Sequence, residues 1–295
     1  MTILVTGGAG QLATSLVQEG RAAVRLVGRP AFDFDRPQTI EAAFADAVPS
    51  LVVNAAAWTA VDAAEKEPGA AMRANRDGPA SLARLCAAAG IPLIHVSTDY
   101  VFDGDKNQPY VETDATNPTC VYGATKLAGE LAVLAANPRS IVLRTSWVYS
   151  ATGKNFVKTM LGAAQKTDRL RVVGDQKGCP TSARDLAAAI LAIADRLHDG
   201  WQDGYAGVFH AAGAGWTTWH GLATAVFEDA AAHGSKVPVV DAIRTEDWPT
   251  PARRPPDSRL DCGKLSRVFG VRQPDWRGSV TRTIDELLGP SAAQG

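Results

Sequence analysis

A tyrosine and a lysine, Tyr122 and Lys126 in the string YGATK, are the side chains of this sequence best suited to acid–base chemistry. On a helix, a spacing of four places both on one face. An ammonium group beside a phenol stabilises the phenolate and lowers the phenol pKa, which makes tyrosine a workable proton donor near neutral pH. The pattern is common by itself, so its weight depends on the residues around it.

Polar residues follow two expected strands at one edge of the expected sheet. Ser97, Thr98 and Asp99 end one apolar run, and Asn54 ends another. Ligands of doubly wound sheets bind at the carboxyl ends of the strands, where a hydroxyl can hydrogen-bond a carbonyl oxygen. We therefore expect these residues and the tyrosine–lysine pair to share one crevice.

The first apolar run leads directly into the string TGGAGQLA, in which a tight turn opens a helix. Gly7 would permit the turn, and Gly10 would let the backbone approach a pyrophosphate at the helix N-terminus. The spacing G-x-x-G-x-x-A departs from the common G-x-G-x-x-G, and a plain strand–helix turn is the alternative. Its position after the first strand favours dinucleotide binding.

The second expected strand ends near Arg29. The acidic residue that commonly follows this strand and holds an adenosine ribose is missing at its end. An arginine there could meet the 2′-phosphate of NADP, whereas Asp33 and Asp35 could serve the ribose. A solvated surface position is the other interpretation of Arg29. We expect NADPH as the cofactor, with NADH as the alternative.

Short β-branched runs alternate with longer Ala/Leu-rich segments of helical period. This rhythm predicts an α/β fold with a Rossmann-type, doubly wound parallel sheet. The expected strands are residues 2–6, 24–27, 51–54, 93–97 and 141–144. The expected helices are residues 11–19, 37–47, 79–89 and 122–135. Each helix is long enough to cross over the sheet between parallel strands.

After Trp147 the composition changes, and Gly, Pro and Trp become frequent. We expect residues 1–150 to form an NAD(P)-binding Rossmann domain, to which a strand at 170–173 and a helix at 183–194 are added. Residues 151–295 are expected to form mainly a smaller C-terminal substrate-binding lobe. Within it, residues 241–258 are rich in proline without clear periodicity, which predicts a loop.

Other residues of this half have two interpretations each. The proline-rich loop holds three arginines that would either grip a diphosphate or be solvated, namely Arg253, Arg254 and Arg259. Trp147 follows a strand end, where a sugar or base could stack, whereas Trp216 and Trp219 are expected to be packing or loop anchors. His95 lies inside an apolar strand and is expected to be a hydrogen-bonded core residue.

Composition restricts the class of partner. The chain of 295 residues has 30 basic and 31 acidic residues and a net charge of −1, without the basic stripe that a nucleic-acid partner requires. No window reaches the ~18 apolar residues of a membrane span and no cationic leader precedes the first strand, so we expect a cytoplasmic protein. The four cysteines form no C-x-x-C pair, so neither zinc nor disulfides are expected.

The sequence resembles the extended short-chain dehydrogenase/reductases, and within them the dTDP-4-dehydrorhamnose reductases, over nearly the whole chain. The strings that carry the resemblance, several of them peculiar to the subfamily, are residues 7–12, NAAAWTAVD (54–62), STDYVF (97–102), YGATKLAGE (122–130), RTSWVY (144–149), NFVKTM (155–160), DQ (175–176), TTWH (217–220) and residues 254–261. The resemblance implies NAD(P)H-dependent reduction of dTDP-4-dehydro-L-rhamnose to dTDP-L-rhamnose, the last step of dTDP-rhamnose biosynthesis.

The resemblance also implies roles for individual residues. Those expected to lie along the cofactor are Gly10, Gln11 and Leu12 at the pyrophosphate, Asp33 and Phe34 near the adenine, and Ala57, Trp58 and Thr59. Tyr122, Lys126 and Thr98 would form the catalytic set, in which Tyr122 protonates the ketone oxygen and Lys126 tunes Tyr122 and holds the nicotinamide ribose. Thr98 and Asp99 would touch the sugar, and Trp147 would pack on it.

One position departs from the family. Some members are described as dimers joined through a magnesium site of glutamates, one of which falls at Ser15 here. We therefore expect no metal, and a monomer or weak homodimer. Two alternative functions use the same fold: nucleotide-sugar epimerases and dehydratases that retain an oxidised NAD, and a non-catalytic NADP-binding regulatory subunit of methionine adenosyltransferase. The complete set of Thr98, Tyr122 and Lys126 argues against the second.

Overall fold

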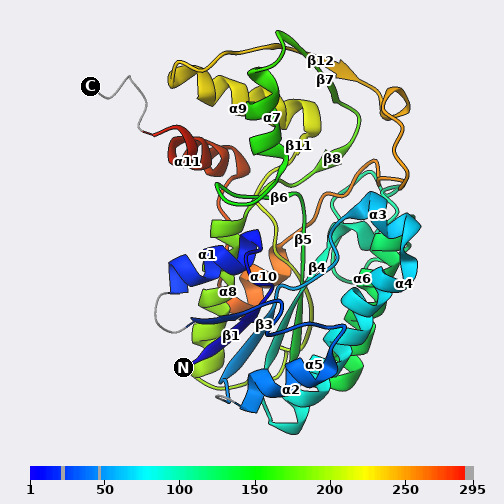
Figure 1. Cartoon of the computed structure of the whole chain (residues 1–295), viewed down its shortest axis with the longest axis vertical. Helices are drawn as coiled ribbons and strands as arrows, with labels where there is room; N and C mark the ends of the chain where they lie inside the picture. The colour runs from blue at the N-terminus through cyan, green and yellow to red at the C-terminus, as the bar shows by residue number, and fades with distance from the viewer. Residues whose placement is uncertain (21–23, 46–47, 290–295) are drawn as a thin grey trace.

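A central parallel sheet with helices on both faces carries a second lobe above it (Figure 1). The computed structural model describes residues 1–20, 24–45 and 48–289. The sheet strands are β1 (Ile3–Thr6), β2 (Val24–Val27), β3 (Leu51–Asn54), β4 (Leu93–Thr98), β5 (Ser140–Thr145) and β10 (Gly207–His210). The strands β1, β3 and β5 are buried along their whole length, because helices cover both faces.

The strand order explains where a ligand can enter. It is β10-β5-β4-β3-β1-β2, with every pairing parallel. The direction of winding reverses between β1 and β3, so the loops that follow these two strands diverge and leave a crevice at the carboxyl edge. The predicted doubly wound α/β fold is therefore confirmed.

Helices on the two faces form two separate cores. The helices of one face are α1 (Gln11–Gly20), α8 (Ala183–His198) and α10 (Gly263–Phe269). Those of the other face are α2 (Pro37–Ala45), α5 (Gly78–Ala88) and α6 (Val121–Ala136). The short segments are α3 (Val61–Lys66), α4 (Pro68–Met72), the π-helical η2 (Arg73–Asp77) and η3 (Asp99–Val101). One core is centred on Leu16 and Ile190 and the other on Leu82 and Val133.

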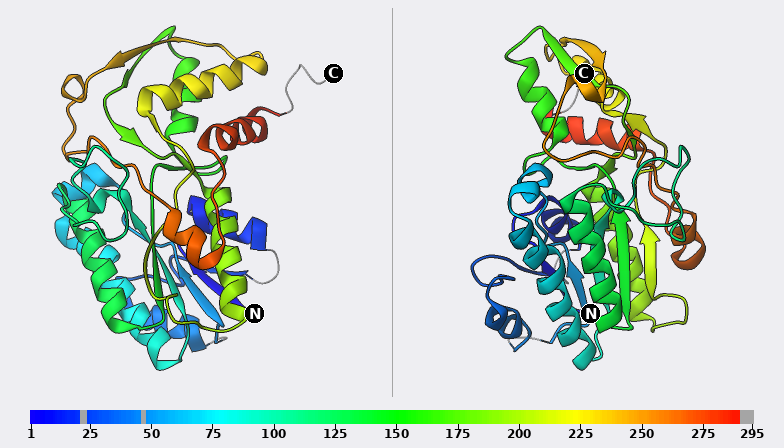
Figure 2. Two further views of the ribbon diagram at one scale, coloured as in Figure 1. Left: turned by 180° about the vertical axis from the view of Figure 1, so that it is seen from behind. Right: turned by 90° about the vertical axis from the view of Figure 1, so that its right-hand side faces the viewer.

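The second lobe stands over the carboxyl edge of the sheet (Figure 2). Its helices and main strands are α7 (Phe156–Ala164), α9 (Trp219–Ala232), α11 (Trp276–Leu288), β7 (Arg169–Val173) and β12 (Val239–Ile243). Its shorter elements are β6 (Val148–Tyr149), β8 (Lys177–Gly178), β9 (Thr181–Ser182), β11 (Thr217–Thr218) and η4 (Thr245–Asp247). Val157, Phe227 and Ile284 belong to its own buried core. No described helix combines the length and the apolar character needed to cross a membrane.

Three details differ from the expectations. Residues 170–173 form a strand, but within β7, which pairs with β12 and not with the central sheet. The strand added to the sheet is β10, which the sequence did not single out, whereas α8 packs against α1. Residues 241–243, expected to be loop, end β12. The end of the helix predicted at 37–47 lies outside the described residues.

Candidate active site

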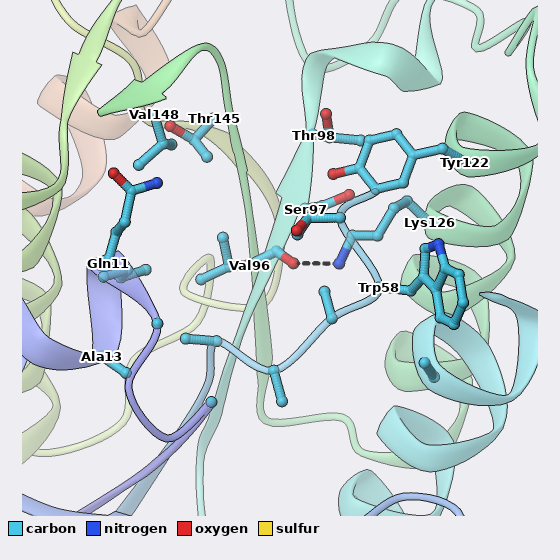
Figure 3. A pocket seen from close by; sticks show the side chains of 18 of the residues that line it. Gln11, Ala13, Trp58, Val96, Ser97, Thr98, Tyr122, Lys126, Thr145 and Val148 are labelled. Carbon is cyan, nitrogen blue, oxygen red and sulfur yellow. Dashed lines mark hydrogen bonds between the residues drawn. The ribbon is translucent and has the colours of Figure 1, made fainter. Parts of the chain in front are cut away.

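A cavity of about 770 Å³ opens where the loops after β1, β3, β4 and β5 meet the second lobe (Figure 3). The predicted site residues that line it are Gly7, Gly10, Gln11, Leu12, Arg29, Asp33, Phe34, Ala57, Trp58, Thr59, Thr98, Asp99, Tyr122, Lys126 and Trp147. Arg254 is the predicted site residue that lies outside this lining. Segments far apart in the sequence thus meet around one space.

The glycine-rich turn forms a cradle for an anionic group. Gly7 has φ +113°, a backbone conformation that side chains rarely adopt, and a Cβ there would meet the Ala55 backbone at 3.1 Å. A Cβ on Gly28 would lie 2.5 Å from the Cα of Gly8. Helix α1 begins at Gln11 directly after the turn, so its N-terminal N–H groups and dipole face the cavity. The turn therefore fits the pyrophosphate of a dinucleotide.

A network of ion pairs lies beside this turn. Arg29 donates to Asp33 and to one oxygen of Asp35, each at 3.0 Å, and Arg73 donates to the other oxygen of Asp35 at 3.0 Å. The Arg29 side chain is 67% exposed, so these pairs contribute little to stability. Two guanidinium groups that share a carboxylate can share a phosphate in the same way. Arg73 was not identified from the sequence, because it follows no strand end.

Close packing at two glycines fixes helix α6. A Cβ on Gly123 would lie 2.2 Å from the carbonyl oxygen of Tyr100, and a Cβ on Gly129 would lie 2.0 Å from that of Asn75. The backbone N–H of the first residue of α6 donates to the Glu65 carboxylate at 2.8 Å. These contacts leave the helix little freedom, and they determine where its cavity face points.

Tyr122 and Lys126 lie on that cavity face, as their spacing predicts. The Tyr122 hydroxyl points into the cavity, on the side of Thr98 (Figure 3). The ammonium nitrogen of Lys126 donates to the carbonyl of Val96 at 2.7 Å. Burial lowers the pKa of Lys126 to about 8, and the negative charge of Glu130 opposes that shift.

One electrostatic expectation was wrong. Burial raises the pKa of Tyr122 above its ordinary value, and a hydrogen bond with Thr98 is what opposes the increase, not the charge of Lys126. The reason is geometric, because the Val96 carbonyl holds the ammonium group. Tyr122 is therefore fully protonated near neutral pH, which is the form that a proton donor needs.

Asp99 is a buried carboxylate beside these groups. Its two oxygens accept hydrogen bonds from the Thr98 hydroxyl at 3.0 Å and from the Ser146 hydroxyl at 2.9 Å. Burial raises the pKa of Asp99 to about 6, although hydrogen bonds from Ser258, Ser146 and Thr98 act to lower it. Ser146 was missed in the sequence, although it follows β5 as Thr98 ends β4, and the same strand-end signal applies to it.

Two tryptophans form the second-lobe wall of the cavity. Trp147 lies parallel to Trp219 with ring centroids 3.5 Å apart, and the indole N–H of Trp219 donates to Gln176 at 3.1 Å. Trp219 packs on Trp147 and Phe156, as expected of a packing residue, and it also lines the cavity. Trp216 is exposed, and the Arg259 guanidinium lies 4.9 Å from its ring centroid.

Arg254 is held by a carboxylate outside the cavity lining. Its two terminal nitrogens donate to Asp62 at 2.6 and 2.8 Å, and the backbone N–H of Ala252 donates to the same carboxylate at 3.1 Å. Arg259 pairs in a similar way with Asp257 at 2.6 Å. Arg254 and Arg259 are thus engaged within the chain, and Arg254 connects the proline-rich segment to α3.

Two buried polar residues support the cavity floor. Nδ1 of His95 lies 2.9 Å from the Asn54 amide nitrogen. Its Nε2 has no hydrogen-bond partner among the described residues. The expected hydrogen-bonded core histidine therefore has a partner at one ring nitrogen only. Asn75 in η2 accepts a hydrogen bond from the Trp58 N–H at 2.8 Å and donates to Thr125 at 3.0 Å. No motif or periodicity singles out Asn75, which joins the cavity loop to α6.

The fold and the cavity define a Rossmann-type nucleotide-binding protein that carries the tyrosine and lysine of the short-chain dehydrogenases. The chain belongs to the family described as RmlD substrate binding domain, whose model matches residues 1–288. A dTDP-4-dehydrorhamnose reductase of Sinorhizobium fredii is 47% identical over 290 residues, covering 98% of each chain.

Solved structures agree with this assignment. The crystal structure of a dTDP-4-dehydrorhamnose reductase from Clostridium acetobutylicum superposes with a TM-score of 0.90 at 36% identity, covering 97% of this chain and 99% of the other. A dTDP-4-dehydrorhamnose reductase from Bacillus anthracis in complex with NADP gives a TM-score of 0.88 at 31% identity, covering 97% and 100%.

Proposed function

We propose that this protein reduces dTDP-4-dehydro-L-rhamnose to dTDP-L-rhamnose, the last step of dTDP-rhamnose biosynthesis. NADPH is the proposed cofactor and NADH the alternative. The observation that carries the proposal is the cavity, which brings the tyrosine–lysine face of α6 next to a dinucleotide cradle. A relative 47% identical along nearly the full chain bears the name of this reductase, and a similar structure contains NADP.

The residues around the cradle fit such a cofactor. Those proposed to hold it are Gly7, Gly10, Gln11 and Leu12 at the pyrophosphate, Arg29, Asp33 and Phe34 at the adenosine, and Ala57, Trp58, Thr59, Tyr122 and Lys126 toward the nicotinamide. When bound, the reduced nicotinamide supplies the hydride. The protein's part is to orient the reacting groups and to exclude water from them.

Tyr122 is the proposed proton donor to the ketone oxygen. Because burial raises its pKa, the phenol keeps its proton near neutral pH until negative charge develops on the substrate oxygen. The Thr98 hydroxyl is proposed to donate a hydrogen bond to the same oxygen, for which it must release its hydrogen bond to Asp99. Lys126 has a pKa of about 8, so it is mostly charged at pH 7 and can hold the nicotinamide ribose.

The second-lobe side of the cavity is proposed to take the sugar. Asp99 offers carboxylate oxygens to sugar hydroxyls, and Trp147 offers an apolar face to the ring. Arg254 is proposed to bind the diphosphate, for which it must exchange its pairing with Asp62. Asp99 and Trp147 come from residues 1–150, the proposed cofactor-binding domain, and residues 151–295, the proposed substrate-binding lobe, contribute Arg254.

We also infer a cytoplasmic enzyme that acts as a monomer or weak homodimer, without a metal and without a nucleic-acid partner. Among the described residues, no group of three or more His, Cys, Asp or Glu side chains is placed to hold a metal ion. Ser15 on α1 is buried and brings a hydroxyl in place of a carboxylate. Sedimentation with and without Mg²⁺ tests this inference, and a magnesium-dependent dimer would contradict it.

The test of the function is to mix the purified protein with NADPH and dTDP-4-dehydro-L-rhamnose and follow nicotinamide absorbance. We expect stoichiometric oxidation, which an epimerase, a dehydratase or a non-catalytic subunit would not produce. Tyr122→Phe should lower kcat about 10³-fold, because it removes the proton donor. Tyr205→Phe, in the core against Phe269, is the matched control and should keep full activity. Absence of NADPH oxidation by the wild type would refute the proposal.

A further inference from the structure

A buried carboxylate lies one helical turn beyond Lys126. Glu130 is 1% exposed, and its oxygens accept hydrogen bonds from Nε of Arg144 at 2.9 Å and from Nη2 at 2.7 Å. The Ser97 hydroxyl donates to the same carboxylate. Burying an ion pair costs about as much free energy as it returns, and apolar residues of the same size are often no less stable. Stability alone therefore does not account for this pair.

The pair joins the three elements that surround the chemistry. Ser97 and Arg144 are register partners across β4 and β5. Ser97 is followed by Thr98 and Asp99, and Arg144 is followed by the cavity residues Thr145 and Ser146. Glu130 contacts both strand ends from α6, so it fixes the helix face relative to the strand ends.

The same carboxylate acts on the charge of Lys126. Lys126 is 2% exposed, so burial favours its neutral form, and Glu130 favours its charged form. The other titratable groups nearby are Tyr122 on α6, which burial keeps protonated, and His95 on β4, which burial and Lys126 keep neutral. On β5, the Arg144 guanidinium pairs with Glu130 at 2.7 Å. Glu130 is thus the negative charge that sustains the ammonium group.

We propose that Glu130 is a positioning residue of the reductase, which keeps Lys126 charged and holds the ends of β4 and β5 against the catalytic face of α6. This inference rests on the proposed function for the role of Lys126. It also predicts how NADPH binding depends on pH, because a charged Lys126 is needed to hold the nicotinamide ribose. This pH dependence can be measured without the sugar substrate.

The first test is Glu130→Gln, which keeps the size and an acceptor oxygen but removes the charge. We measure the pH dependence of NADPH binding by fluorescence, and that of kcat/KM. The basic limb of both profiles should move to lower pH by about one unit, because Lys126 then loses its proton more readily. Glu19→Gln removes a carboxylate that pairs with Arg184 at 2.9 Å and lies outside the cavity lining, so it is the matched control and should leave both profiles unchanged.

Glu130→Gln leaves Arg144 buried without its full partner and can prevent folding. The double variant Glu130→Leu/Arg144→Met removes both charges together and keeps an apolar core, so it should fold. Its profile should move in the same direction but by less, because the positive charge of Arg144 is lost as well. A wild-type pH profile for NADPH binding in a folded double variant would overturn the proposal. If the wild type binds NADPH with the expected profile but reduces no dTDP-4-dehydro-L-rhamnose, the proposed substrate fails and the role of Glu130 stands.

Discussion

Trp147 stacks face to face on Trp219, with the ring centroids 3.5 Å apart and 7° between the ring planes. Trp147 also has φ +48°, in the left-handed region that residues other than glycine rarely occupy. Its ring is pressed against Gly178, where a Cβ would lie 2.3 Å from the indole. The stack and the glycine together hold an unfavourable backbone conformation in place at a residue that lines the cavity.

Gly178→Ala should therefore displace the Trp147 ring. We expect the KM for the nucleotide sugar to rise about tenfold, since an aromatic contact contributes up to ~1.5 kcal/mol, with NADPH affinity unchanged. Steady-state kinetics and a fluorescence titration with NADPH measure the two effects. Gly162→Ala, in α7 with open space around it, is the control. Equal KM values for the two variants would contradict this role of the stack.

Substitutions of Arg254 and Asp62 test whether Arg254 binds the diphosphate. Arg254→Ala should raise the KM for the nucleotide sugar about tenfold, because a hydrogen-bonded charge is lost. Asp62→Asn removes the carboxylate that competes for Arg254, so its KM should stay equal or fall. Arg253→Ala, the exposed neighbour, serves as control in the same assay. If Arg254→Ala keeps the wild-type KM, the arginine has only a structural role.

The exposed Arg29 tests cofactor preference. Arg29→Ala should lower kcat/KM for NADPH about tenfold through the lost contact with the 2′-phosphate, and it should leave kcat/KM for NADH nearly unchanged. Arg36→Ala, on the same loop and exposed, provides the comparison. Equal losses of kcat/KM with NADPH and NADH would show that Arg29 stabilises the loop conformation and does not bind the 2′-phosphate.

Asp99 gives the protein a pH-dependent stability. Its pKa rises from 3.8 when unfolded to about 6 when folded, so the folded state binds more protons and stability falls as pH rises from about 4 through 6. Asp99→Asn removes this effect. Relative to wild type, the variant should gain about 1 kcal/mol more in free energy of unfolding at pH 8 than at pH 5. Urea denaturation at both pH values measures this, and equal effects at both would contradict it.

The sheet strands and crossover helices were predictable because each has a local signature. The strands 24–27 and 51–54 coincide with β2 and β3, and the helix predicted at 11–19 differs from α1 by one residue. A short apolar run indicates a strand that is buried on both faces, and a helical period indicates a helix that is buried on one face. Both patterns are visible in a few consecutive residues. The edge strand β10 has four residues, as β2 and β3 do, but its sequence GVFH holds only two apolar residues between a glycine and a histidine, so its apolar signal is weaker.

The sequence by itself determined those parts of the cavity chemistry that depend on residues close together in the chain. The glycine turn before α1 and the spacing of Tyr122 and Lys126 need only local geometry. Tertiary structure alone decided which groups meet across long separations, such as Arg254 with Asp62, 192 residues apart, and Ser150 with Gln11. It also turned Lys126 toward the Val96 carbonyl and Trp219 into the cavity. The reason is that strand order and the packing of the second lobe set these distances, and neither leaves a periodic trace in the chain.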